Sequence, residues 1–355
     1  MAEVWDNIHY SFRAVDGFDK NFIFVMSPRE PGKTTAMWFE KIYKVWKKKH
    51  KPWIYVVRNA VEISESLIDS IADTIINKFT DDNVKLEYKS GAFKGGIVDV
   101  TIEGKIFVRI VALSCKLRKI KLAVLKDIGG VYMDEYIIDP TTQEKYLPGE
   151  AFKIKEAYNT WRREYKGKGS LKWYFCANPY TLHNPLFISW KVETNNLKRD
   201  SFYVGDTFVI HWAILSKELR EKLLRENPLY KFDDDYNRYA LDGEAIQDSN
   251  IKIGKLPEGF KLQFVFKYDK MFIGVFQNWN DFTYNEDRFY CKQLDTTGKR
   301  EIICFDFNEM IERSILLGLN EKAKLRFFKE CVRMRLVSFE NINLYYIIKE
   351  IYAII

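Results

Sequence analysis

The chain of 355 residues contains no long apolar run and no pair of cysteines at metal-binding spacing. No run approaches the roughly 18 residues that a membrane span needs, and the N-terminal stretch MAEVWDNIHY lacks the apolar core of a signal peptide. The five cysteines are scattered, and the four histidines are isolated. These absences argue against a membrane segment, disulfides and a structural zinc site. We therefore expect a protein of the cytoplasm.

Composition and charge bound the possible functions further. With 47% apolar and 16% aromatic residues, the chain can bury a large core, and its length favours two domains. The net charge is only +7, but lysine and arginine residues cluster in three segments, 41–51, 116–126 and 322–335. The first two segments contain no acidic residue, and the third contains only Glu330. Such stripes suit a polyanion, although each taken singly is equally compatible with a solvated helix face.

The segment SPREPGKTT, Ser27 to Thr35, lies between an apolar run and a helical pattern. This order of strand, loop and helix is what a phosphate-binding loop requires. In such a loop Lys33 reaches the β- and γ-phosphates, the Thr34 hydroxyl takes a magnesium position, and Gly32 lets the backbone come close. Ser27 stands where the first loop glycine is usual, so a chance Gly-Lys-Thr turn is the competing interpretation. The predicted nucleotide-binding residues are Ser27, Arg29, Gly32, Lys33, Thr34 and Thr35.

A second motif, VYMDEY at 131–136, supplies the acids that nucleotide hydrolysis needs. Asp134 ends a short apolar strand, and an aspartate in that position beside the loop can hold magnesium through water. The next residue, Glu135, can polarise the attacking water. An Asp-Glu pair at a solvated strand end is common, but it gains meaning beside Gly-Lys-Thr. Together the motifs predict hydrolysis of ATP with Mg²⁺.

The first 205 residues alternate strands and helices, which predicts an α/β domain with a mostly parallel sheet, a P-loop ATPase of the ASCE type. Asn178 follows the last predicted strand, at the sheet edge where ligands bind. It could sense the γ-phosphate, although a turn-forming Asn-Pro is a comparable interpretation. The predicted strands are 22–26, 53–58, 106–113, 131–133 and 172–176, and the predicted helices are 34–48, 62–78 and 151–165.

The rest of the chain predicts a linker over 206–245 and a smaller α/β domain over 246–355. In this domain we expect a hairpin that turns at Asp269, two further strands and two C-terminal helices. A two-metal nuclease needs several carboxylates within about 4 Å of two ions. The strand around 265–268 is instead apolar, basic or aromatic. Nuclease activity is therefore not expected.

These motifs resemble those of the DNA-packaging ATPases, or encapsidation proteins, of small short-tailed phages that package with a structural RNA, distant relatives of terminase large subunits. Terminase-type loops often lack the first glycine and carry an arginine at the position of Arg29. The resemblance implies that Glu135 is catalytic and that Asn178 belongs to a coupling motif. It also implies that 159–163 carries an arginine finger for the neighbouring subunit, with Arg162 the better candidate and Arg163 next.

The resemblance further implies a homo-oligomeric ring, expected to be a pentamer, on the portal of a procapsid. The ring would drive double-stranded viral DNA inward, would act in the host cytoplasm and transiently at the portal vertex, and would be absent from the mature virion; use of a packaging RNA stays open. The C-terminal domain resembles a degenerate RNase H-like nuclease that docks to nucleic acid or the portal. The predicted nucleic-acid contacts are Lys116, Arg118, Lys119, Lys121, Lys322, Lys324, Arg326, Lys329, Arg333 and Arg335.

Three alternatives remain at this stage. A terminase that also cuts DNA would need clustered acids after Asp242, for which Asp269, Asp295 and Asp306 are available. A non-enzymatic scaffold with a dead site predicts loss of the lysine or the acids, and all are present. A generic helicase-like ATPase would share both motifs and differs only in its C-terminal domain. For the base of the nucleotide, Trp5, Tyr10 and Phe12 are candidate stacking partners.

Overall fold

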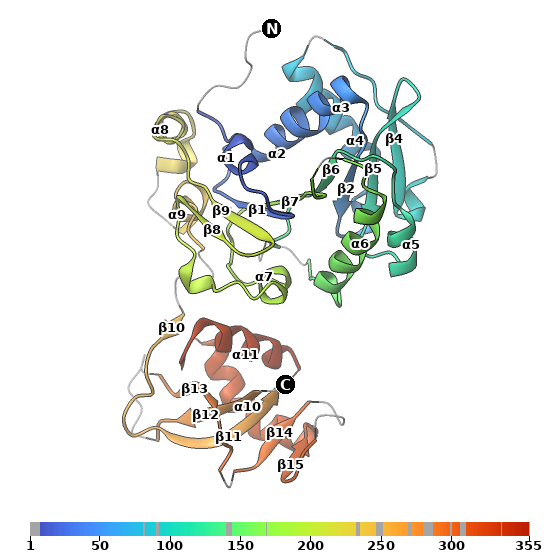
Figure 1. Ribbon diagram of the computed structural model, residues 1–355. Helices are drawn as coiled ribbons and strands as arrows, with labels where there is room; N and C mark the ends of the chain where they lie inside the picture. Colours follow the sequence, from blue (N-terminus) through green and yellow to red (C-terminus); the bar gives the residue numbers. More distant parts are fainter. Residues whose placement is uncertain are drawn as a thin grey trace. The chain divides into compact units, whose positions relative to one another are not determined.

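The computed structural model divides the chain into two compact units, Met1–Ile246 and Gln247–Ile355 (Figure 1). The described residues are 8–80, 82–89, 92–139, 144–167, 169–231, 235–245, 251–268, 271–279, 287–298, 300–305, 310–334 and 336–354.

A mostly parallel sheet forms the centre of the first unit. In its described residues the strand order is β3-β4-β5-β2-β6-β7-β1-β9-β8. The six strands from β5 to β9 run parallel, while β3, β4 and β8 add antiparallel edges. The strands are β1 Phe22–Met26, β2 Trp53–Val57, β3 Glu87–Tyr88, β4 Ile97–Ile102, β5 Lys105–Ala112, β6 Gly130–Met133, β7 Trp173–Ala177, β8 Ser201–Val204 and β9 Phe208–Trp212.

Helices cover both faces of this sheet (Figure 1). The α-helices are α1 Arg13–Asp16, α2 Lys33–Ala36, α3 Lys44–Lys49, α4 Glu65–Asp69, α5 Leu117–Leu122, α6 Glu150–Glu164, α7 Pro185–Ser189, α8 Lys217–Glu226 and α9 Asp235–Ala240. Among the described residues of this unit, two segments are π-helical, Met37–Tyr43 and Ser70–Ile76, and five are short 3₁₀ turns, Ala60–Glu62, Asn77–Phe79, Ala92–Gly95, Thr194–Asn196 and Pro228–Lys231.

The alternation of side chains along β1 shows why the unit has three layers. All five residues of β1 are buried. Phe24 packs with α6 and α7 in one core, whereas Val25 packs with the helix that begins at Lys33 in the other. A parallel strand covered on both faces must be apolar throughout, and that is the pattern of the sequence.

Strand β7 lies between β1 and β6, so the strand before the phosphate loop does not touch the strand that ends at Asp134. Parallel strands present their carboxyl ends at one edge of a sheet. The loop after β1, the acids after β6 and Asn178 after β7 therefore meet at the same edge. This inserted strand confirms the predicted ASCE-type α/β fold.

The predicted strands and helices of the first domain are confirmed to within a few residues, but the linker over 206–245 is wrong. Strand β9 pairs with β1, and its five residues are all buried. The charged sequence of α8 suggested a linker, yet Leu219 and Leu223 are buried in the core of the first unit. The first unit therefore extends to residue 246.

The second unit is a mixed α/β domain with the order β10-β16-β13-β12-β11-β14-β15. Strands β11, β12 and β13 form an antiparallel meander, and β14 and β15 run parallel to β11. The hairpin is confirmed, although its turn at Asp269 lies outside the described residues. The elements are β10 Lys252–Ile253, β11 Lys261–Tyr268, β12 Met271–Gln277, β13 Phe289–Leu294, β14 Ile302–Cys304, β15 Ser314–Leu316, α10 Leu319–Arg333, β16 Val337–Phe339 and α11 Ile342–Ile354.

Helices α10 and α11 pack against the sheet of the second unit through Phe328 and Ile348, which lie in one core with Phe266. In the described part of the chain, none of the helices has the length and apolar character needed to cross a membrane.

Candidate active site

The phosphate loop turns into a long helix at Gly32. This glycine has φ of 82° and precedes α2, and its carbonyl accepts a hydrogen bond from the amide of Ala36. A left-handed residue at this point costs little only for glycine. Helix α2 continues through the π-helical segment into α3, so the loop faces the amino end of a helix that runs to Lys49. Backbone amides at such an end favour phosphate.

Lys33 is held at the mouth of the loop by oxygen atoms. Its Nζ donates to Ser27 Oγ at 2.8 Å, to the carbonyl of Pro28 at 3.1 Å and to Asn178 Oδ1 at 3.1 Å. The side chain is buried, and burial lowers the pKa of Lys33 to about 8. Because the amine is already oriented, it can receive a phosphate without reordering its stem.

Thr34 and Asp134 form the candidate magnesium position. Thr34 Oγ1 donates to Asp134 Oδ2 at 2.9 Å, which joins the loop after β1 to the end of β6. A hydroxyl and a carboxylate are hard oxygen ligands of the kind that Mg²⁺ takes together with water and substrate phosphate. Among the described residues, no group of three or more His, Cys, Asp or Glu side chains is placed to hold a metal alone. The Thr34 and Asp134 pair thus fits Mg²⁺ carried in with a phosphate.

Glu135 lies two residues after the end of β6 and has a left-handed backbone, at φ of 53°. Such a conformation is uncommon outside glycine and is often found at functional positions. Partial burial and then the negative charge of Asp134 raise the pKa of Glu135. A carboxylate with a raised pKa is better matched to accepting a proton near neutral pH.

A buried ion pair behind Glu135 was not predicted from the sequence. Arg58 at the end of β2 and Glu150 at the start of α6 are 3% and 1% exposed. Arg58 Nε lies 3.1 Å from Glu150 Oε2, and Arg58 Nη2 donates to the carbonyls of Glu135 and Tyr136 at 3.1 and 3.2 Å. The only signal in the sequence was a charged residue directly after an apolar strand.

Arg29 hydrogen-bonds to tyrosines from two segments, one directly after β7 and one in α9. Its Nη2 donates to Tyr180 Oη at 2.8 Å, its Nε donates to Tyr239 Oη at 3.2 Å, and Asp139 lies 3.7 Å away. The Arg29 amide also donates to the carbonyl of Ala240. The predicted linker thus packs on the phosphate loop. Thr35 is half-buried on α2.

Three solved structures resemble the chain. The bacteriophage Phi-29 viral genome packaging motor assembly is 18% identical, with 98% of this chain and 99% of that chain covered and a TM-score of 0.67. The Phi-28 gp11 DNA packaging motor is 16% identical, with 98% of each chain covered and a TM-score of 0.64. The N-terminal domain of the DNA packaging ATPase from bacteriophage phi29 is 20% identical, covering 60% of this chain and 98% of that one at a TM-score of 0.47.

The chain has the fold of phage DNA-packaging motors. The first two similarities extend over both units, so the fold implied by the resemblance is confirmed over nearly the whole chain. No protein-family model and no curated protein matches the sequence.

Arg162 and Arg163 lie far from the site of their own chain. Both are exposed near the end of α6. Arg162 is twelve residues after Glu150, which is roughly 18 Å along a helix. One turn earlier, Tyr158 Oη hydrogen-bonds to Asn21 and to the carbonyl of Leu171, before the amino ends of β1 and β7. The helix therefore runs from the carboxyl edge of the sheet towards its amino edge.

The predicted DNA-contact residues of α5 lie on the surface beside α6. Lys116, Arg118 and Lys119 are exposed, and the Lys119 amine donates to the carbonyl of Gly95. Lys121 forms an ion pair with Glu156 of α6. This pair engages one of the four charges and joins the basic helix to the helix that carries Arg162.

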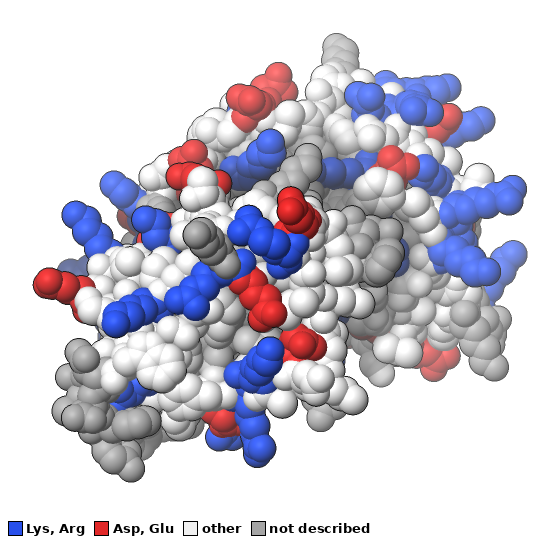
Figure 2. Space-filling model, turned by 90° about the horizontal axis from the view of Figure 1, so that it is seen from below, with Lys and Arg blue, Asp and Glu red and all other residues white. Residues whose placement is uncertain are grey.

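Most basic residues of α10 form a stripe along one face of the helix and are not spread evenly around it. Spacings of three and four residues place Lys322, Arg326, Lys329 and Arg333 on one helix face. Lys324 lies off this face, and Arg335 lies outside the described residues. Within the stripe, Arg333 pairs with Glu330 at 2.6 Å and Lys329 lies over the ring of Tyr352. Figure 2 shows Lys and Arg side chains over the face seen from below, with Asp and Glu side chains among them.

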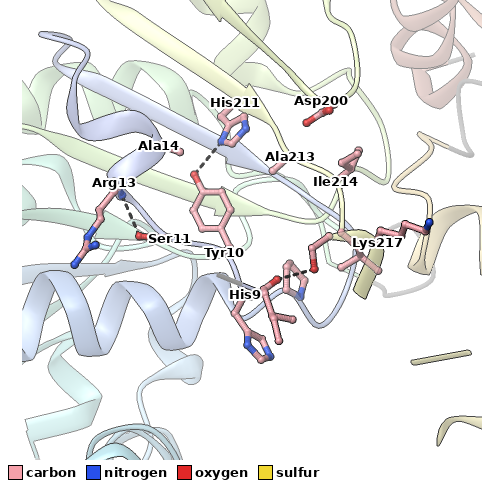
Figure 3. Close-up of a pocket in the computed structure, with 14 residues that line it drawn as sticks. His9, Tyr10, Ser11, Arg13, Ala14, Asp200, His211, Ala213, Ile214 and Lys217 are labelled. Atoms are coloured by element: carbon pink, nitrogen blue, oxygen red, sulfur yellow. Dashed lines mark hydrogen bonds between the residues drawn. The ribbon is translucent and has the colours of Figure 1, made fainter. Parts of the chain in front are cut away.

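A pocket of about 610 Å³ opens beside Pro31 of the phosphate loop (Figure 3). Tyr10 Oη and His211 Nδ1 lie 3.1 Å apart on its wall, and burial lowers the pKa of His211 to about 4. Of the candidate stacking partners, Phe12 is wrong because it has no exposed surface. Trp5 lies outside the described residues, and Tyr10 lines the pocket but is 8% exposed.

Proposed function

We propose that this chain is the ATP-hydrolysing subunit of a motor that drives double-stranded viral DNA into a preformed procapsid. The observation that carries the proposal is one sheet edge at which Lys33, Thr34, Asp134, Glu135 and Asn178 lie together, on a fold shared with packaging motors. Each residue type matches one part of phosphoryl transfer to water.

The chemistry follows from the positions of these side chains. Lys33 neutralises charge on the β- and γ-phosphates, while Thr34 and Asp134 would hold Mg²⁺, which supplies further charge neutralisation when bound. Glu135 accepts a proton from the attacking water as its oxygen bonds to the γ-phosphorus and the bond to the ADP oxygen breaks. Asn178, already hydrogen-bonded to Lys33, is placed to respond to the γ-phosphate.

The pocket beside Pro31 is the proposed subsite for the base and ribose. Pro31 of the phosphate loop lines this pocket. Its wall also carries the polar groups of Tyr10 and His211 (Figure 3). His211 is neutral at pH 7 because its pKa is near 4, so it offers hydrogen bonds to a neutral ring.

A homo-oligomeric ring, expected to be a pentamer, completes the proposed motor. Arg162 and Arg163 lie at the far end of α6 and cannot reach the Glu135 of their own chain. They are therefore proposed to act on the neighbouring subunit's site, stabilising charge in the transition state. Ring size is left to experiment.

The two basic helices are proposed to contact nucleic acid. The exposed lysine and arginine side chains of α5 suit the phosphate backbone of DNA. The basic stripe on α10 suits docking to a packaging RNA or to DNA near the portal. Nuclease activity is not expected. The proposed location is the host cytoplasm and, transiently, the portal vertex.

The test is a packaging assay with purified chain, cognate procapsids, ATP and viral DNA. The expected result is DNA protected from an added nuclease, in an amount that depends on ATP and is abolished by Glu135→Gln. Protection of equal extent with Glu135→Gln, or without ATP, would refute the proposal.

A further inference from the structure

A bracket of five contacts surrounds the Arg58 guanidinium. Three are made by the carboxylate of Glu150 and the carbonyls of Glu135 and Tyr136. In addition, the ring of Tyr146 lies 5.4 Å from the central carbon, and Glu144 Oε2 lies 3.9 Å from Nη1. Glu150 in turn accepts from the amide of Leu147 at 2.9 Å. The bracket therefore joins the ends of β2 and β6 to the loop and first turn of α6.

The bracket acts on the backbone of Glu135 and not on its carboxylate. Glu135 has φ of 53°, a conformation that a non-glycine residue keeps only where its surroundings hold it. Two hydrogen bonds from one Arg58 nitrogen fix the two peptide planes that flank Tyr136, and the first of these is the peptide that directly follows Glu135. The direction in which the Glu135 side chain leaves the strand thus depends on Arg58.

We propose that Arg58 and Glu150 are positioning residues that hold Glu135 in the left-handed conformation needed for its catalytic direction. Glu150 orients the guanidinium through Nε, which leaves Nη2 for the two carbonyls. This inference rests on the proposed function of Glu135 and deepens it. Arg58 is a planar fork, so lysine cannot reproduce both sets of bonds.

Breaking one partner of a buried ion pair can unfold a protein, so the informative variant removes both. Replacement of a buried pair by apolar residues of similar volume is often neutral or stabilising. Arg58→Met with Glu150→Leu should therefore fold. It should bind ATP as the wild type does, because Lys33, Thr34 and Asp134 keep their contacts, and its kcat should fall about 100-fold from misdirection of Glu135.

The chain offers a matched control pair on the same sheet. Arg109 of β5 binds Asp99 of β4 through Nε and Nη2, and its Nη1 donates to the carbonyls of Ala123 and Val124. This arginine has the same partner types but holds no residue of the candidate site. Arg109→Met with Asp99→Leu should leave kcat without DNA unchanged.

The experiment measures ATP binding, KM and kcat without DNA for the wild type and both double variants, and compares crystal structures of the wild type and the Arg58 double variant. Support would be a loss of kcat in the Arg58 double variant alone, with KM and ATP binding unchanged, and Glu135 displaced from its left-handed conformation. A folded Arg58 double variant with wild-type kcat would overturn the inference while leaving the proposed function intact.

A wild type that hydrolyses no ATP either with or without DNA would instead overturn the proposed function. The crystal structures then still decide the positioning step: Glu135 unmoved in the double variant contradicts it, and Glu135 displaced supports it. Arg58→Lys, which keeps the charge but cannot bond Glu150 and both carbonyls together, should also lose kcat while ATP binding stays unchanged, a separation that a merely stabilising pair would not produce.

Discussion

The two units have similar architecture and opposite chemistry. In the first, the carboxyl ends of β1, β6 and β7 carry a lysine, two acids and an amide. In the second, the middle of β11 and the whole of β14 are buried and apolar, with Val265 and Ile302 paired in register. Sheets covered by helices are common to many functions. The comparison teaches that the side chains at strand ends, and not the layers, determine what each unit can do.

The most direct way to break the comparison is to remove the proposed general base, Glu135, from the first unit. Glu135→Gln should keep ATP binding, because Lys33, Thr34 and Asp134 are intact, and should lower turnover by at least about 100-fold through loss of proton acceptance. Steady-state hydrolysis and nucleotide binding are measured together. The control is Glu87→Gln on the exposed edge strand β3, which should change neither. Wild-type turnover in Glu135→Gln would remove Glu135 from the mechanism.

Removing the loop lysine should damage a different step. Lys33→Ala loses the ammonium that four oxygen contacts hold at the loop, so nucleotide affinity itself should fall by at least about tenfold. Isothermal titration with a non-hydrolysable ATP analogue tests this. Lys48→Ala on the exposed end of α3 is the matched lysine control. Equal affinities for Lys33→Ala and Lys48→Ala would contradict the assignment.

A mixture of two inactive variants tests whether the first unit works as part of a ring. Arg162→Ala and Glu135→Gln subunits should each be inactive alone, and mixing them should restore part of the activity, because some interfaces then contain both groups. The measurement is ATP turnover across mixing ratios, repeated with Arg163→Ala. Activity that only follows dilution in every mixture would argue against a residue acting between subunits.

Nucleic-acid binding by the second unit should depend on its basic side chains and not on its acidic ones. Lys322→Glu with Arg326→Glu, on the basic face of α10, should weaken nucleic-acid binding by the full chain and reduce the salt slope by about 2. Lys324→Glu, off this face, is the control. DNA cleavage in magnesium or manganese that is lost when one aspartate of this unit is replaced would contradict the docking role. It would show instead that the unit cuts DNA.

The smallest expected effect is on stability. Burial lowers the pKa of Lys33 from 10.5 to about 8, so the unfolded chain binds more protons between those values and stability from this group rises with pH there. Below pH 8 the buried charge costs on the order of 3 kcal/mol. Lys33→Met should therefore be more stable than the wild type at pH 7, with the gap closing by pH 10. Urea unfolding at both values measures it, and a constant gap would contradict it.

Much of the first unit was predictable because its signals are local. Five apolar strands, a Gly-Lys-Thr turn and an Asp-Glu pair are each written in a few consecutive residues. Parallel pairing then brings their carboxyl ends to one edge, so the contacts of Lys33 with Asn178 and of Thr34 with Asp134 follow from the fold. The roles of these residues stay predictions until variants are measured.

What the sequence did not reveal is long-range pairing. Arg58 and Glu150 lie 92 residues apart and meet only after β2 and α6 are packed. The apolar strand β9 was placed in a linker because the charged helix α8 after it dominated the composition of that segment. Phe12 looked available for stacking, but burial in the core is decided by packing and not by residue type.

The measurement that tests the central claim most directly is ATP turnover by the wild-type chain with and without double-stranded DNA over a range of protein concentrations. The account predicts hydrolysis that rises steeply with protein concentration, because each site needs an arginine from a neighbour, and that increases when DNA is added. Absence of hydrolysis at every concentration would contradict it, as would turnover per chain that is independent of both concentration and DNA.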